Sequence, residues 1–94
     1  MTATLDAEIR NALRDVMDPE LGRSLLDLGL IYSIETSPDG GVRIAMTTTA
    51  RGCPLAGFLK DAVEMRVSAV EGVSSVETWL TYDPVWTPAM MANN

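Results

Sequence analysis

Apolar side chains recur with helical spacing at the start of the chain and again in its second half. The first set predicts a helix that begins with Thr4 as its N-cap and ends before Asp18-Pro19, because the residue before proline avoids helical geometry. Its apolar face consists of Leu5, Ile9, Ala12, Leu13, Val16 and Met17. The second set predicts a helix over residues 54–70, with Pro54 in the first helical position and Gly72 as the C-terminal cap. Its apolar stripe consists of Leu55, Leu59, Ala62, Val63, Val67 and Val70.

Between and after these helices the pattern changes to alternation, which is typical of strands. Residues 30–36, 42–49 and 73–82 each predict a strand, with Leu30, Tyr32 and Ile34 on one face of the first. The turn-rich segment 37–41 predicts an antiparallel hairpin.

A helix long enough for a right-handed crossover then makes the second and third strands parallel. We therefore expect a small two-layer α/β sandwich in α-β-β-α-β order, as one domain over residues 1–94. Its three-stranded mixed sheet has both helices packed on one face.

Residues 18–29 show no clean period, although they lie between a helix and a strand. A connection of this length is usually functional or contains a short helical turn. Residues 24–28 are where we expect such a turn.

Composition and charge exclude several classes of protein. The chain has 94 residues with a net charge of −6, so nucleic acid is a poor partner. No apolar stretch approaches the length of a membrane span, and the N-terminus lacks the basic start and apolar run of a secretion signal. The absence of histidine excludes a Ser-His-Asp triad, a Cys-His dyad and a histidine zinc site. We expect a cytoplasmic protein whose single cysteine stays reduced.

The segment 46–54 carries the most specific chemistry. A strand ends in Thr47, Thr48 and Thr49, and a glycine-containing loop then brings Cys53 to the start of a helix. Exposed N–H groups at a helix start stabilise a thiolate and lower the pKa of the thiol, and a neighbouring Arg51 acts in the same direction. A thiolate is both a nucleophile and a soft metal ligand. A lone cysteine is also often a small buried hydrophobe, and the residues alone leave both interpretations open.

Two further groups of residues are weaker candidates. Asp18, Glu20 and Asp27 are either oxygen ligands or a base beside the thiol, or they cap turns and helices. Trp86, with Met90 and Met91, forms either an exposed surface for a partner or a cover that folds back over the core.

In these motifs the chain resembles the iron–sulfur cluster assembly domain family, to which SufT and the phenylacetate-pathway protein PaaD belong. Five motifs carry the resemblance in order over nearly the whole chain. They are Asp18-Pro19-Glu20, Asp27-Leu28-Gly29-Leu30-Ile31-Tyr32, Met46-Thr47-Thr48-Thr49 followed by Cys53-Pro54, Gly72-Val73, and Asp83-Pro84-Val85-Trp86 followed by Met90. The departures are Thr48 in place of the usual leucine and Val85 in place of a second proline.

The resemblance implies the same α/β fold and a non-enzymatic role in maturing iron–sulfur proteins, with Cys53 as the functional residue. Because a cluster generally takes four cysteine ligands, one chain with one cysteine implies a labile cluster or iron that is not tightly bound. Asp27, a small thiol, a client protein or a second copy in a homodimer would supply the other ligands. The expected partners are the assembly machinery or apo-client proteins. The alternative is an adaptor that recruits such clients through Trp86, Met90 and Met91 without binding metal.

Overall fold

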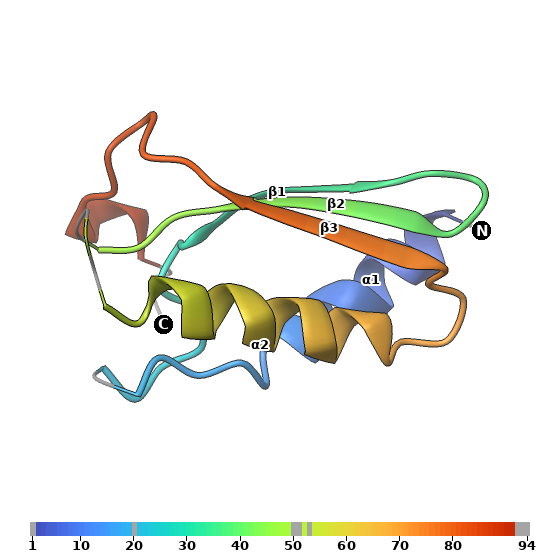
Figure 1. Cartoon of the computed structure of the whole chain (residues 1–94), viewed down its shortest axis with the longest axis horizontal. Helices are drawn as coiled ribbons and strands as arrows, with labels where there is room; N and C mark the ends of the chain where they lie inside the picture. Colours follow the sequence, from blue (N-terminus) through green and yellow to red (C-terminus); the bar gives the residue numbers. More distant parts are fainter. Residues whose placement is uncertain (1, 20, 50–51, 53, 92–94) are drawn as a thin grey trace.

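The structure is a computed structural model that describes residues 2–19, 21–49, 52 and 54–91. Its elements follow one another in the predicted α-β-β-α-β order (Figure 1). They are α1 (Thr2–Leu13), β1 (Ile31–Thr36), β2 (Gly41–Met46), α2 (Ala56–Ser68), β3 (Ser75–Leu80) and a final 3₁₀ turn η1 (Pro88–Met90).

The three strands form one mixed sheet in the order β1-β2-β3. β1 and β2 pair antiparallel, and β2 and β3 pair parallel, as the turn-rich segment and the crossover helix predicted. Both helices lie on the same side of the sheet (Figure 1). The predicted two-layer α/β architecture is therefore confirmed.

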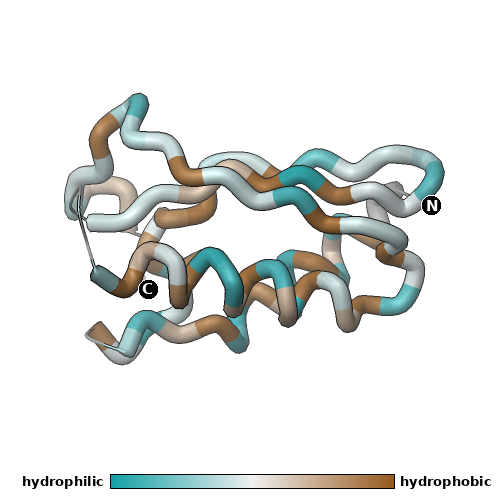
Figure 2. The backbone as a smooth tube through the Cα atoms, viewed as in Figure 1, coloured by the Kyte–Doolittle hydropathy of each residue, from teal (hydrophilic) through white to brown (hydrophobic). Residues whose placement is uncertain are grey.

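The core lies between the sheet and the helix layer. The helix 54–70 stripe is confirmed, because Leu59, Val63 and Val67 are buried and its other members pack partly against the core. From β2, the side chains of Val42, Ile44 and Met46 face this layer and are buried. Brown and teal alternate along α2 in the hydropathy view, as expected for a helix with one buried face (Figure 2). Within the described part of the chain, no helix has the length and apolar character needed to cross a bilayer.

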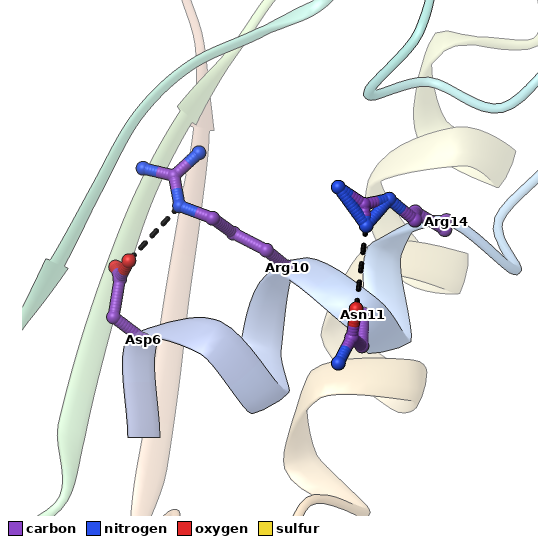
Figure 3. Close-up of polar contacts among 4 residues, drawn as sticks. All are labelled: Asp6, Arg10, Asn11 and Arg14. Carbon is purple, nitrogen blue, oxygen red and sulfur yellow. Dashed lines mark hydrogen bonds and ion pairs between the residues drawn. The ribbon is translucent and has the colours of Figure 1, made fainter. Parts of the chain in front are cut away.

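The outward face of α1 carries polar side chains that pair along the helix. Arg10 donates through Nε to the Asp6 carboxylate at 2.9 Å, and Arg14 donates to Asn11 Oδ1 at 3.3 Å (Figure 3). These are exposed contacts three or four residues apart, which stabilise a helix only weakly. This face is therefore the solvated side of the helix.

The predicted bounds of the first helix are wrong at both ends. α1 begins at Thr2, before the expected cap Thr4, and it ends at Leu13. After it, the Val16 carbonyl accepts a hydrogen bond from the Leu25 N–H at 2.9 Å, and Met17 forms a single β-bridge with Ser24. Val16 still reaches the core, whereas the Met17 side chain is 49% exposed. A long-range backbone contact therefore replaces the last predicted helical turn.

The caps predicted for the second helix are also wrong. α2 begins at Ala56 with Leu55 as its N-cap, so Pro54 lies before the helix. It ends at Ser68 with Ala69 as a right-handed C-cap. Gly72 has a φ of +97° but serves the turn into β3, where its carbonyl lies close against Gly40.

Tyr32 does not continue a regular alternation with Leu30 and Ile34, which the sequence predicts to lie on one face of the strand. The pairing with β2 shifts register between Ile31 and Ser33, so Tyr32 sits at a bulge. Its hydroxyl donates to the Pro84 carbonyl at 2.8 Å. The bulge therefore directs this side chain toward the C-terminal segment.

Candidate functional site

The end of the sheet where β2 stops is built around three consecutive threonines. The Thr47 N–H donates to the Leu30 carbonyl at 2.9 Å, and Thr47 is fully buried. The Thr48 hydroxyl is buried and lies 2.8 Å from the Tyr82 hydroxyl. Thr49 is exposed. The chain therefore passes from a fixed, buried strand end to the surface at Thr49.

Arg51 and Cys53 lie outside the described residues. Gly52 and Pro54, which precede and follow Cys53 in the chain, are described, and both are exposed. Gly52 has a φ of +74°, a left-handed conformation that favours glycine. Gly52 and Pro54 are therefore exposed parts of the connection between β2 and α2.

The first turn of α2 follows directly. Its N-cap, Leu55, forms no side-chain capping hydrogen bond, and the turn contains no acidic residue. The first N–H groups of such a helix lack partners within it and carry a partial positive charge. This end of α2 is therefore electrostatically suited to an anion such as a thiolate.

A second loop, residues 24–30, lies against the same end of the sheet through the Leu30 carbonyl. The predicted short turn over 24–28 is confirmed, since the Leu28 N–H donates to the Ser24 carbonyl at 3.0 Å. The Ser24 hydroxyl caps this turn by accepting from the Asp27 N–H at 3.0 Å. Asp27 is half-buried, and the contact it makes here is through its backbone N–H rather than its carboxylate. No described contact joins it to the threonines.

The other two acidic candidates differ in position. Asp18 is buried, and its carboxylate accepts from the Leu21 N–H at 3.2 Å, while its carbonyl accepts from the Gly22 N–H at 2.8 Å. The side chain therefore closes the turn after α1, which is the capping alternative. Glu20 lies outside the described residues.

The C-terminal segment packs against loop 24–30. Trp86 is half-buried against the core, and its indole N–H donates to the Leu28 carbonyl at 2.7 Å. Met91 also packs on the core and accepts from Arg23 through its sulfur at 3.6 Å. The Met90 sulfur lies 3.7 Å from the Tyr32 hydroxyl, whose single proton is donated to the Pro84 carbonyl. The three proposed surface residues are thus half-buried and held against the body of the molecule.

One glycine permits this packing. A Cβ on Gly29, whose φ is +75°, would lie 2.3 Å from the Met90 carbonyl oxygen. The sequence does not predict that Tyr32, Tyr82 and Arg23 make contacts at this end of the molecule. Their partners lie far away along the chain, so no local pattern indicates these contacts.

The described residues do not contain a closed metal site. No three acidic side chains among them group closely enough to hold a metal ion.

Comparisons with known proteins give one consistent result. A family model described as iron-sulfur cluster assembly protein matches residues 6–78. An Fe-S protein maturation auxiliary factor of Porphyromonas gingivalis is 42% identical over 87 residues, which cover 93% of this chain and 83% of that protein. The Fe-S protein maturation auxiliary factor YitW of Bacillus subtilis is 37% identical over 92 residues, covering 98% and 90%. The crystal structure of a DUF59 domain from Bacillus anthracis superposes with a TM-score of 0.92 at 30% identity, covering 97% of this chain and 87% of that one.

Proposed function

Because the chain belongs to the iron-sulfur cluster assembly protein family, we propose that it is an assembly or transfer factor in which Cys53 transiently binds iron or a cluster. One observation carries the proposal. The residues on both sides of Cys53 are exposed and lead directly into the uncapped first turn of α2. The positive end of a helix lowers the pKa of a cysteine thiol beside it, and the resulting thiolate is the form that binds soft metals.

The number of ligands decides what kind of binding this is. A cluster generally takes four cysteine ligands, and the chain contains one. The cluster is therefore cargo, held between this chain and the assembly machinery, an apo-client protein or a second copy. Such shared coordination leaves the cluster open and labile, which suits transfer better than storage.

The other predicted residues have supporting roles in this proposal. Asp27 supplies a carboxylate ligand, whereas Asp18 closes the turn after α1 and Glu20 lies outside the described residues. Thr47, Thr49, Arg51 and Pro54 shape and polarise the connection that carries Cys53. The relatives are named auxiliary factors rather than enzymes, and without histidine or a second cysteine the chain lacks the usual partners of a thiol enzyme. We assign its action to the cytoplasm, where a lone thiol stays reduced.

Anaerobic reconstitution with ferrous iron and sulfide tests the role of Cys53. Wild type and Cys53→Ser are loaded in parallel, passed over gel filtration and compared by visible absorbance. We expect a cluster chromophore in wild type that Cys53→Ser lacks. Absence of the chromophore from both proteins, with both folded by circular dichroism, would reject direct binding and favour the adaptor alternative.

The role of Asp27 has its own matched pair of variants. Asp27→Asn should reduce the loading of iron or shorten the lifetime of the chromophore, because it removes one oxygen ligand. Asp83→Asn makes the same change at an exposed position in the C-terminal segment and should leave loading unchanged. Equal loading of both variants and wild type would remove Asp27 from the site.

A further inference from the structure

The outer face of α2 carries an apolar stripe of which only Ala62 packs partly against the core. It consists of Phe58, Ala62, Met65 and Ala69, which follow one another at intervals of four, three and four residues. This is the spacing with which one helix packs along another. Phe58 is 61% exposed and Met65 is 75% exposed, whereas the core stripe of α2 lies on another face of the helix.

This stripe forms one wall of a groove. Val16 and Met17, in the segment after α1, form the other wall, and the groove has a volume of about 420 Å³. The segment that follows α1 runs beside the helix layer beneath the N-terminal half of α2 (Figure 1). Three of the five large hydrophobic side chains that are exposed among the described residues line this groove. Such clustering of exposed apolar side chains is typical of a surface that binds another protein.

Two charges flank the stripe, one on each side. Asp61 and Arg66 are five positions apart, which places them about 140° apart around the helix, too far for an ion pair within α2. Asp61 is exposed and forms no ion pair with another described residue. Arg66 uses its Nη2 to bind Asp15 at the rim of the groove, at 2.5 Å, and this leaves other guanidinium N–H groups for a further partner.

We infer that this stripe is a self-association surface, on which α2 of a second copy packs parallel to α2 about a two-fold axis. In that arrangement opposite flanks of the two helices meet, so Asp61 faces Arg66 of the second copy, and the symmetry repeats the pair. An antiparallel arrangement would bring like flanks together, with aspartate beside aspartate and arginine beside arginine. The charges therefore select the parallel arrangement.

This inference rests on the proposed function and adds a dimer to it. Parallel packing brings the N-terminal ends of both α2 helices to the same end of the dimer, where two chains together offer more ligands than one. A single helical stripe per copy is small compared with a typical interface of roughly 1,600 Å². The dimer should therefore be weak and dependent on concentration.

Sedimentation velocity of the wild-type chain, under reducing conditions and without iron, tests the surface. We expect the weight-average mass to rise with protein concentration. Met65→Glu should weaken the association by tenfold or more without unfolding the chain, because Met65 is largely exposed in the monomer. Val85→Glu makes the same change at a side chain that is 66% exposed and outside the groove, and it should associate as wild type does.

The charges allow a complementation test. Asp61→Arg and Arg66→Asp should each weaken self-association, since each creates like charges across the interface. An equimolar mixture of the two variants should associate again, because both pairs then join opposite charges.

The orientation of the helices is tested by cross-linking. Ala62→Cys in a Cys53→Ser background should form a disulfide-linked dimer on mild oxidation, because parallel packing places residue 62 opposite itself. In an antiparallel dimer, residue 62 would instead face residue 65 of the second copy.

Three results would overturn the inference: a monomer at all concentrations, a dimer that Met65→Glu leaves intact, or a mixture that fails to associate. A dimer without the Ala62→Cys cross-link would overturn the parallel orientation. These measurements contain no iron, so they succeed or fail independently of the reconstitution at Cys53.

Discussion

The hydroxyl of Thr78 is buried on the core face of β3 and has no hydrogen-bond partner among the described residues. A buried polar group without a partner costs roughly 1–3 kcal/mol. Thr78→Val keeps the shape and removes this group, so it should raise the free energy of unfolding by about 1 kcal/mol. Urea denaturation followed by circular dichroism measures the change.

Thr48→Val is the matched control for that substitution. Thr48 is buried as well, but its hydroxyl is bonded to the Tyr82 hydroxyl, so the same change should lower stability by about 1 kcal/mol. Destabilisation by Thr78→Val would mean that its hydroxyl is satisfied in solution.

Trp86 provides a second prediction at the scale of single residues. Trp86→Phe keeps an aromatic ring on the core but loses the N–H that binds the Leu28 carbonyl, which is left without this partner. We expect a loss of about 1 kcal/mol in the free energy of unfolding by urea. Trp79→Phe is the control, because Trp79 contacts Arg43 through its ring, with the guanidinium carbon 5.3 Å from the ring centre. A phenylalanine ring keeps a contact of this kind, so Trp79→Phe should lower the free energy of unfolding by less. Equal losses would mean that the bond to Leu28 contributes nothing.

At the scale of elements, two glycines should respond in opposite directions to alanine. Gly57 lies in the first turn of α2, and a Cβ there would meet nothing within 4 Å, so Gly57→Ala should stabilise by roughly 0.5–1 kcal/mol. Gly40 has a φ of +88°, and its Cβ would lie 2.4 Å from the Gly72 carbonyl oxygen. Gly40→Ala should therefore destabilise by about 2 kcal/mol or more. Thermal unfolding of both variants beside wild type checks the signs, and a stabilising Gly40→Ala would contradict the close packing of the two turns.

The elements also show where prediction from sequence ends. The stripe of α2 and the pairing of the strands follow from periods of 3.6 and 2, which are local properties, and both were predicted correctly. The end of α1 was not predicted correctly, because the Val16 carbonyl accepts a hydrogen bond from the Leu25 N–H and lies beyond the end of the helix. The position of Tyr32 was not predicted correctly either, because it depends on a bulge, and a bulge is a property of two paired strands rather than of one. The errors therefore fall where contacts distant along the chain decide local structure.

The same division applies to the site. Cys53 in the segment before a helix is a local motif, so the sequence alone is sufficient to name it as a candidate, which stays a prediction. The contacts around that end of the molecule, such as Trp86 with Leu28 and Tyr82 with Thr48, join segments that no period or motif relates. The apolar stripe of Phe58 and Met65 was different, because its spacing is visible in the sequence. The core stripe on another face is sufficient to predict this helix, so the exposed stripe adds nothing to that prediction.

At the scale of the whole molecule, the core predicts that folding does not depend on metal. The buried cluster consists of aliphatic side chains and one methionine, from both helices, the sheet and the loops between them. Small metalloproteins that unfold without metal obtain their folding free energy from the bound ion, and nothing in this core requires such a contribution. Wild type treated with an iron chelator should therefore unfold at the same urea concentration as untreated metal-free protein.

Cys53→Ser is the control for chelation, because it removes the proposed ligand permanently. Both metal-free proteins should have the same cooperative transition within about 0.5 kcal/mol, the usual range for a surface substitution. Wild type loaded with iron should gain stability in proportion to the logarithm of the ratio between the free iron concentration and the dissociation constant. This gain in stability is small for a labile site, because its dissociation constant is large. If chelation instead lowers the midpoint well below that of Cys53→Ser, metal is part of the folded core's stability, and a transient carrier is the wrong description.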